Sequence, residues 1–199
     1  MYHDILATQI VPDLDRVKYL DEAQTIYNKR KVTNRLPRVE FLFEKKNPVY
    51  FIGDGEKTSY VLLIEAATEH VAYVVKYHRV SHNALRLGRQ VLMVRNPAST
   101  ISGGFAQTIF FEYLLKRYSA LVGDQHQTLA GRAFWRNALQ SAFRFGLYVY
   151  YLDRRSRQAV LTQLHSTKDL EDNADNIWGF PKSYELVFPV ISEIELQLS

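Results

Sequence analysis

The chain has 199 residues, of which 47% are hydrophobic and 13% aromatic. This composition excludes a disordered protein, and the length fits one domain with a shared core more readily than two. The absence of cysteine excludes disulfides, thiolate metal sites and cysteine nucleophiles. A net charge of +4 permits an acidic partner, but the basic residues are mixed with acidic ones, so nucleic-acid binding is a weak expectation that stays open.

The sequence gives no indication of export or membrane insertion. The N-terminal residues lack a basic region followed by an apolar run, and no apolar stretch approaches the roughly 18 residues that span a bilayer. We therefore expect a protein of the cytoplasm that has no contact with a membrane.

The first half of the chain predicts one helix followed by a meander of strands. Residues 12 to 30 have apolar side chains at helical spacing, and Pro12 suits a first helical turn. Short strands are expected at 39–43 and 49–52. Three stronger runs, rich in Val, Leu, Ile and Tyr and separated by polar turns, then predict antiparallel strands at 59–66, 71–80 and 88–95.

The second half alternates helices with strands. Helices are expected at 105–118 and 128–145, and strands at 120–124 and 147–152. Residues 154–176 are polar and predict a long loop, and residues 186–191 predict a last edge strand interrupted by Pro189. The predicted fold is therefore α/β (α+β), with a mixed central sheet in which an antiparallel meander precedes a β-α-β-α-β segment. We expect a single domain over 1–199, with an N-terminal helix and short strands in 1–57 and the core in 58–192.

Three motifs stand out in this order of elements. The third strong strand reads Arg89-Gln-Val-Leu-Met-Val-Arg95, and the loop Ser102-Gly-Gly104 opens the next helix. The segment Leu121-Val-Gly-Asp-Gln-His-Gln-Thr-Leu-Ala-Gly-Arg-Ala-Phe-Trp135 then follows. Together they resemble the GNAT superfamily of N-acyltransferases, in the form encoded by bacteriophages and prophages, over roughly residues 58–192. The resemblance implies a GNAT-like fold and the transfer of an acetyl or other acyl group from acyl-CoA to the amine of an unknown substrate.

The resemblance implies a binding site for acetyl-CoA, or another acyl-CoA, at the start of the first helix after the meander. A pyrophosphate needs several backbone N–H groups directed at one point, and glycines at a helix N-terminus supply them without obstruction. An alternative is that the glycine pair only begins a helix after a loop. The expected cofactor-binding residues are Ser102, Gly103, Gly104, Phe105, Ala106, Gln107, Gln127 and Thr128.

Three residues are candidates for catalysis. Asp124 could accept a proton from an amine, and His126 could act as a general base because its ordinary pKa lies near neutrality. Tyr150 could protonate the departing thiolate, a role that the GNAT resemblance commonly gives to a tyrosine. The alternatives are that Asp124 and Thr128 cap a helix, that His126 lies on the surface and that Tyr150 packs in the core.

The chain departs from the GNAT pattern in two places. The strand 88–95 contains no acidic residue where a glutamate base is often found, and Phe134-Trp135 occupies a position where a tyrosine is expected. An alternative function is therefore that of a catalytically inactive GNAT-fold phage protein that binds a host factor during host takeover or counter-defence. The histidine spacing fits no metal site, so we expect no metal. The sequence leaves the acceptor, the host partner and the oligomeric state undecided.

Overall fold

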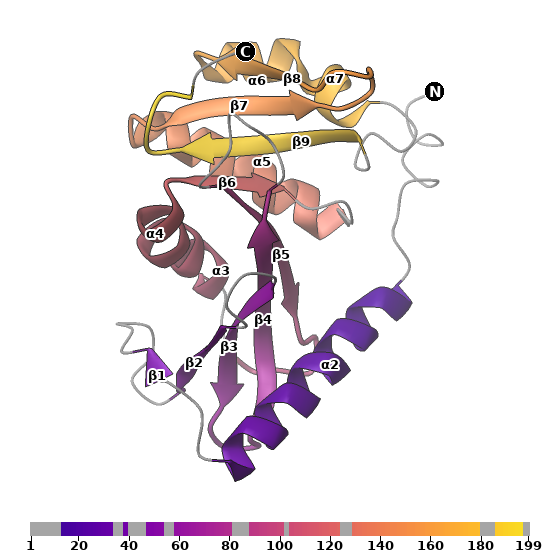
Figure 1. Ribbon diagram of the computed structural model, residues 1–199, viewed down its shortest axis with the longest axis vertical. Helices are drawn as coiled ribbons and strands as arrows, with labels where there is room; N and C mark the ends of the chain where they lie inside the picture. Colours follow the sequence, from indigo (N-terminus) through magenta and orange to yellow (C-terminus); the bar gives the residue numbers. More distant parts are fainter. Residues whose placement is uncertain are drawn as a thin grey trace. The chain divides into compact units, whose positions relative to one another are not determined.

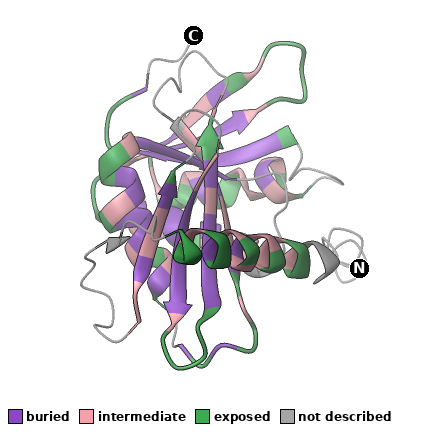
Figure 2. Cartoon of the chain, turned by 60° about the horizontal axis from the view of Figure 1, so that its bottom comes forward, coloured by how far each residue is buried: buried purple, intermediate pink, exposed green. Residues whose placement is uncertain are grey.

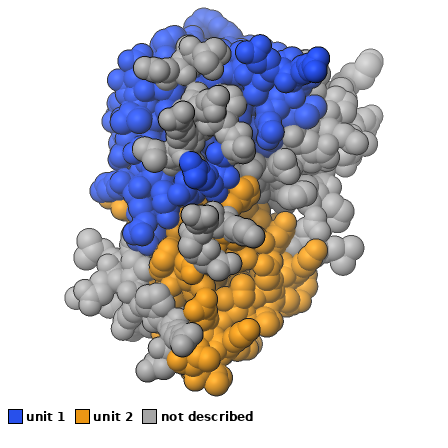
Figure 3. Space-filling model, viewed as in Figure 1, with its two compact units in different colours: residues 1–11, 79–90, 113–199 blue, residues 12–78, 91–112 orange. Residues whose placement is uncertain are grey.

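The chain forms two compact units, which Figure 3 distinguishes by colour. The computed structural model describes residues 13–33, 38–39, 47–53, 58–80, 88–101, 104–123, 129–179 and 186–196. Among these residues, unit 1 draws on 79–90 and 113–199, and unit 2 on 12–78 and 91–112. Since each unit is assembled from separate stretches, no single cut in the chain would divide one from the other.

Unit 2 consists of a helix and an antiparallel meander, followed by the start of a second helix (Figure 1). Its strands follow the order β1-β2-β3-β4-β5, and Val49 of β2 faces Leu63 of β3 in the register. A register shift between Leu63 and Ile64 interrupts the β3–β4 ladder. The elements are α2 (Asp13–Val32), β1 (Arg38–Val39), β2 (Val49–Gly53), β3 (Thr58–Glu65), β4 (His70–Arg79), β5 (Gly88–Arg95) and α3 (Phe105–Thr108). The last residue of β4 and the first three residues of β5 belong to unit 1.

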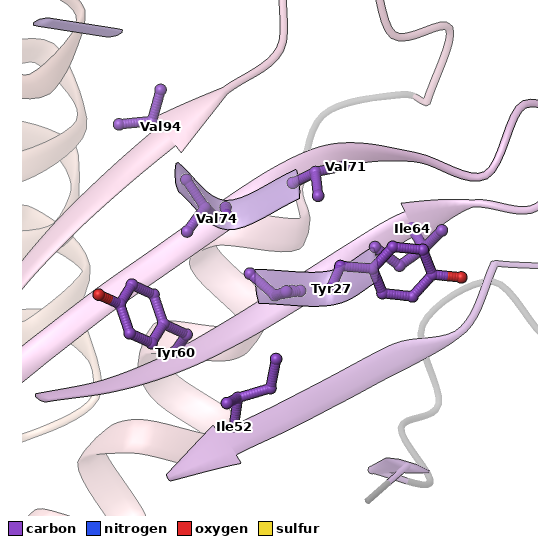
Figure 4. Close-up of a cluster of buried hydrophobic side chains, with 9 residues drawn as sticks. Tyr27, Ile52, Tyr60, Ile64, Val71, Val74 and Val94 are labelled. Carbon is purple, nitrogen blue, oxygen red and sulfur yellow. The ribbon is translucent and has the colours of Figure 1, made fainter. Parts of the chain in front are cut away.

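Helices cover both faces of this sheet, which explains why β3 is buried without alternation from Tyr60 to Ile64. On one face, Ala23 and Tyr27 of α2 pack against alternate residues of the strands (Figure 4). Figure 2 shows the opposite side of α2 exposed to solvent. On the other face, Phe105 of α3 is fully buried and its ring lies 5.3 Å from that of Tyr73.

Unit 1 contains strands β6 to β9, and the last strand of the chain has a strand on each side. Its strands follow the order β6-β9-β7-β8, and β9 is antiparallel to both of its neighbours. The elements are η2 (Ile109–Leu115), α4 (Lys116–Tyr118), β6 (Ala120–Gly123), α5 (Leu129–Arg144), β7 (Tyr148–Asp153), β8 (Val160–Leu164), α6 (Thr167–Asp172), α7 (Ala174–Trp178) and β9 (Val187–Ser192). The first of them, η2, is a π-helix, and its first four residues belong to unit 2.

The core of unit 1 is apolar on both faces of its sheet. One cluster joins side chains from β6, β7, β8 and β9 and includes Val122, Leu152 and Phe188. Helix α5 packs against β7 and β9 and buries Trp135, Ala138, Leu139 and Ala142. These four residues follow the spacing of one helical face, as expected for a helix held by an apolar stripe.

The predicted fold class is confirmed: the chain mixes helices with strands, and the meander β3-β4-β5 precedes a helix, β6, α5 and β7. The predicted strand 88–95 coincides with β5. The bounds of the predicted helix 12–30 agree with those of α2 to within two residues, and the bounds of the predicted helix 128–145 agree with those of α5 to within one residue. Of the first predicted strand, 39–43, only Val39 is described, and it belongs to β1; residues 40–43 lie outside the described residues.

The prediction of a long loop over 154–176 is wrong, because this stretch contains β8, α6 and part of α7. The polar residues of this stretch include those that begin helix α6. The Ser166 hydroxyl accepts a hydrogen bond from the N–H of Asp169, and the Asp169 carboxylate accepts one from the N–H of His165. This is a capping pair, with serine followed three residues later by an acid.

The prediction of an edge strand at 186–191 is also wrong, since β9 lies between β6 and β7. Pro189 faces Tyr151 of β7, while the ladder between β9 and β6 extends only from Val190 to Ser192. Proline is therefore tolerated in an inner strand because it lies just beyond the end of one of the two ladders.

Candidate functional site

The candidate site is built on the loop that joins β5 to α3 in unit 2. Asn96 begins the loop, and its backbone N–H donates to the carbonyl oxygen of Ala72 at 2.8 Å. Its side-chain amide donates to the carbonyl oxygen of Val71 at 3.0 Å, and its Oδ1 accepts from the N–H of Ala98 at 3.0 Å. One asparagine thus ties the loop to β4 and shapes the first turn after β5.

A carboxylate at the end of β3 binds the middle of the same loop. Glu65 Oε1 accepts hydrogen bonds from the backbone N–H of Thr100 at 3.2 Å and from the Thr100 hydroxyl. The Thr68 hydroxyl donates to the other oxygen, Oε2, at 3.2 Å. The Thr100 hydroxyl is the main reason why the pKa of Glu65 lies below its ordinary value, so Glu65 binds the loop as an anion.

The end of the loop contacts Arg95 and Ser99. The Arg95 guanidinium donates to the carbonyl oxygen of Ile101 at 3.0 Å and lies 5.9 Å from the centre of the Tyr73 ring. The buried hydroxyl of Ser99 accepts from the N–H of Ile101 at 3.2 Å. Four separate side chains, from β3, β5 and the loop itself, therefore fix the path of the backbone up to residue 101.

The helix that follows begins at a glycine in the left-handed region. Gly104 has φ 101° and ψ −27°, makes no side-chain cap hydrogen bond and is exposed. The first turn of α3 contains no acidic side chain, and the carbonyl oxygen of Gly104 accepts from the N–H of Thr108 at 2.9 Å. A helix start of this kind directs backbone N–H groups outward without a competing carboxylate, which suits a phosphate group.

The helix continues as a π-helix over Ile109–Leu115 before a short α-helical turn, Lys116–Tyr118. The wider turn places Ile109, Phe110, Leu114 and Leu115 in the interior. A π segment this long is uncommon, and such segments are frequent near functional sites. The predicted helix over 105–118 is therefore confirmed in extent but not in its hydrogen-bonding pattern.

Four of the predicted cofactor-binding residues, Gly104, Phe105, Ala106 and Gln107, are consecutive at this helix start. The buried Phe105 side chain packs against Tyr73, so only its backbone could contact a ligand. Gln107 is exposed and Ala106 is half-buried. The other four, Ser102, Gly103, Gln127 and Thr128, lie outside the described residues.

Of the three candidate catalytic residues, only Tyr150 is described; Asp124 and His126 lie outside the described residues. Tyr150 is fully buried in the apolar cluster of unit 1, and its hydroxyl oxygen accepts a hydrogen bond from the N–H of Leu196 at 2.9 Å. Burial raises the pKa of this phenol above its ordinary value. In this position Tyr150 stabilises the core of unit 1. Its catalytic role stays a prediction.

Sequence reasoning missed a polar cluster on the face of the unit 2 sheet that α2 covers. The Tyr60 hydroxyl donates to Glu22 Oε1 at 2.6 Å, and Lys76 Nζ lies 3.3 Å from both oxygens of Glu22. The Lys76 ammonium also lies 5.3 Å from the ring centre of Tyr19 and 5.5 Å from that of Tyr60. These residues come from α2, β3 and β4, so no local motif could have indicated the cluster.

Within the part of the chain that the structure describes, no three His, Asp or Glu side chains form a group that could hold a metal ion. None of the described helices is both long enough and apolar enough to cross a bilayer.

The chain was also compared with known proteins. Comparison with protein-family models, with curated proteins and with solved structures finds no match.

Proposed function

We propose that this chain is a GNAT-like, acyl-CoA-dependent N-acyltransferase, encoded by a phage and acting in the cytoplasm of the host cell. It would transfer an acetyl or other acyl group to an amine. The start of α3 is the observation on which the proposal rests: a glycine with positive φ, free of a side-chain cap, opens a helix whose first turn has no acidic residue. The chain order of the meander and the following helices and strands agrees with it.

The described residues fit the demands of an acyl-CoA at this place. The backbone at Gly104, Ala106 and Gln107 would hold the pyrophosphate, while Asn96 and Glu65 keep the preceding loop in position. The cofactor supplies a thioester whose acyl carbon an amine attacks; the amide forms and the thiolate of CoA leaves. Asp124 and His126 are the candidates to take the proton from the amine.

Calorimetry and thermal unfolding with acetyl-CoA test the proposal. For a ligand at a hundred times its Kd, we expect a stabilisation of about 2.7 kcal/mol. Gly104→Ala should abolish that stabilisation, because a side chain at φ 101° strains the helix start and moves its amides. If the unaltered protein gives neither heat nor a shift in Tm, the proposed function fails.

Gly146→Ala is the matched control. Gly146 also has positive φ, 70°, but it lies in the turn after α5, and an added Cβ would meet no atom within 4 Å. Both variants should lose roughly 1–2 kcal/mol of stability from backbone strain. Only Gly104→Ala should lose the response to acetyl-CoA, and an equal loss in both variants would argue against the α3 site.

The burial of Tyr150 favours a second candidate, a catalytically inactive GNAT-fold phage protein that binds a host protein. Its hydroxyl, hydrogen-bonded to Leu196 inside the core, is not placed to reach a substrate without rearrangement. Acetyl transfer to a panel of amines, measured beside pull-down from host lysate, separates the two candidates. A stoichiometric host partner together with no transfer and no acetyl-CoA binding would favour the second.

A further inference from the structure

Strands β7 and β8 are neighbours in unit 1 (Figure 1). The turn that joins them is fixed by an internal ion pair between Arg155 and Asp153. Arg155 Nε donates to both carboxylate oxygens of Asp153 at 3.0 Å, and one of its terminal nitrogens lies 2.5 Å from Oδ2. The backbone N–H of Arg155 also donates to Asp153 Oδ1 at 2.9 Å, which closes an Asx-type turn. A hydrogen bond from the Ser156 hydroxyl to the carbonyl oxygen of Gln158 completes the tip.

This arrangement leaves two arginines presented to solvent. Every residue from Arg154 to Gln158 is exposed, and the stretch contains no acidic residue. Asp153 forms its ion pair with Arg155. Among the described residues, neither the Arg154 nor the Arg157 side chain has an ion-pair partner. The tip therefore has a fixed backbone and two cations available for a ligand.

Arginine at such a tip matches phosphate better than it matches most other anions. The guanidinium binds phosphate oxygens through two parallel hydrogen bonds and is weakly hydrated. The end of a two-stranded hairpin is also narrow enough to enter the major groove of a duplex. The tip is already ordered, so it loses little conformational entropy when it binds. A duplex is also rigid and carries a dense row of phosphates, whereas a flexible acidic peptide would lose conformational entropy on binding.

We propose that the β7–β8 tip, residues 153–158, binds the phosphate backbone of duplex nucleic acid through Arg154 and Arg157. Contacts of this kind carry no sequence information, so binding is independent of base sequence and falls with salt. The tip thereby supplies an interaction surface separate from the start of α3, and it could hold the protein near nucleic acid whatever the acceptor amine is.

Fluorescence anisotropy with a short labelled DNA duplex of mixed sequence tests the proposal across a range of salt concentrations. Removing two phosphate contacts with Arg154→Ala/Arg157→Ala should weaken binding on the order of fiftyfold at about 0.1 M salt, and should reduce the slope of log K against log salt by about 1.8. The double lysine variant, Arg154→Lys/Arg157→Lys, keeps the charge and should keep most of the slope. Thermal unfolding of each variant checks that the fold is intact.

Lys29→Ala/Arg30→Ala is the matched control, because it removes the same charge from the last turn of α2. This control should bind the duplex within about threefold of the unaltered protein, since it loses only diffuse attraction that salt screens. No binding of the unaltered protein at about 50 mM salt, or equal losses in the control and the tip variant, would overturn the proposal. Displacement of the duplex by polyglutamate at equal charge concentration would also overturn it, since the tip would then accept any polyanion.

Discussion

Helices α2 and α5 each pack on strands of their own unit, but they are held in different ways. Helix α5 of unit 1 packs through an apolar stripe that includes the buried Trp135 and Leu139. Helix α2 of unit 2 buries Ala23 and Tyr27 but adds Glu22 and Lys31, which form ion pairs with the sheet or its turns. The comparison indicates that salt and acid should loosen the packing of α2 and leave that of α5 nearly unchanged.

The largest expected effect comes from the apolar stripe of α5. Leu139 is fully buried, so Leu139→Ala removes its packing and leaves a cavity; it should lower the free energy of unfolding by about 2–5 kcal/mol. Urea unfolding measures the loss, which should be the same at low and high salt. Phe145, 62% exposed beyond the end of α5, is the control, and Phe145→Ala should cost less than about 1 kcal/mol. Similar losses in both variants would mean that the stripe does not hold α5.

The buried hydroxyl of Tyr150 gives the next effect. Tyr150→Phe removes the acceptor of the Leu196 N–H, and we expect a loss of about 1–2 kcal/mol because that amide remains buried without a partner. The control is Tyr148→Phe on the same strand, whose half-buried ring should tolerate the change within about 0.5 kcal/mol. Chemical unfolding of the two variants compares them. If Tyr150→Phe left stability unchanged, the hydrogen bond would not explain why a tyrosine occupies this core position.

The smallest effect concerns the ionisation of Glu22. Burial alone would raise the pKa of Glu22, but the hydrogen bond from Tyr60 and the charge of Lys76 outweigh it, and the pKa lies below its ordinary value of 4.5. The stabilisation is therefore fully present above pH 4.5 and is lost as pH falls through the lower pKa of the folded state. Because the side chain is 37% exposed, solvent screening limits the contribution to about 1 kcal/mol or less.

Glu22→Gln tests this effect when unfolding is measured at neutral and at acid pH. The variant should be slightly less stable than the unaltered protein at neutral pH, and the difference should shrink in acid. Glu171→Gln, an exposed change on α6 of unit 1, controls for the loss of one negative charge. A difference between the unaltered protein and Glu22→Gln that stayed constant with pH would show that the cluster acts through packing and not through charge.

The sequence predicted elements best where a short-range pattern decides them. The apolar run Val91–Val94 is bounded by polar residues and lies inside the predicted strand 88–95, which coincides with β5. The predicted helix 128–145 likewise agrees with α5 to within one residue at each end. The pattern failed over 154–176, where caps such as Ser166 and not apolar periodicity define the elements. It also failed at Pro189, because the length of a neighbouring ladder is a property of the assembled sheet.

The candidate site could be predicted only in part. The glycine at the start of α3 is visible in the sequence, because few other residues tolerate that conformation. Glu65 and Asn96, which hold the loop before it, were not identified, because their partners Thr100 and Val71 are distant in sequence. The Glu22 cluster was missed for the same reason. Side chains that support a site from other elements leave no local signal.

The inner position of β9 bears on the order of events during synthesis. β6 and β7 cannot complete their hydrogen bonding until residues 187–192 have been made and have left the ribosome, since β9 pairs with both of them. Until then, nascent unit 1 has two unpaired strand edges, and the closure that joins Ser119 to Ser192 spans 73 residues. Non-local closure of this kind is slow, so the interval before β9 is inserted is when a nascent chain is most exposed to aggregation and most dependent on chaperones.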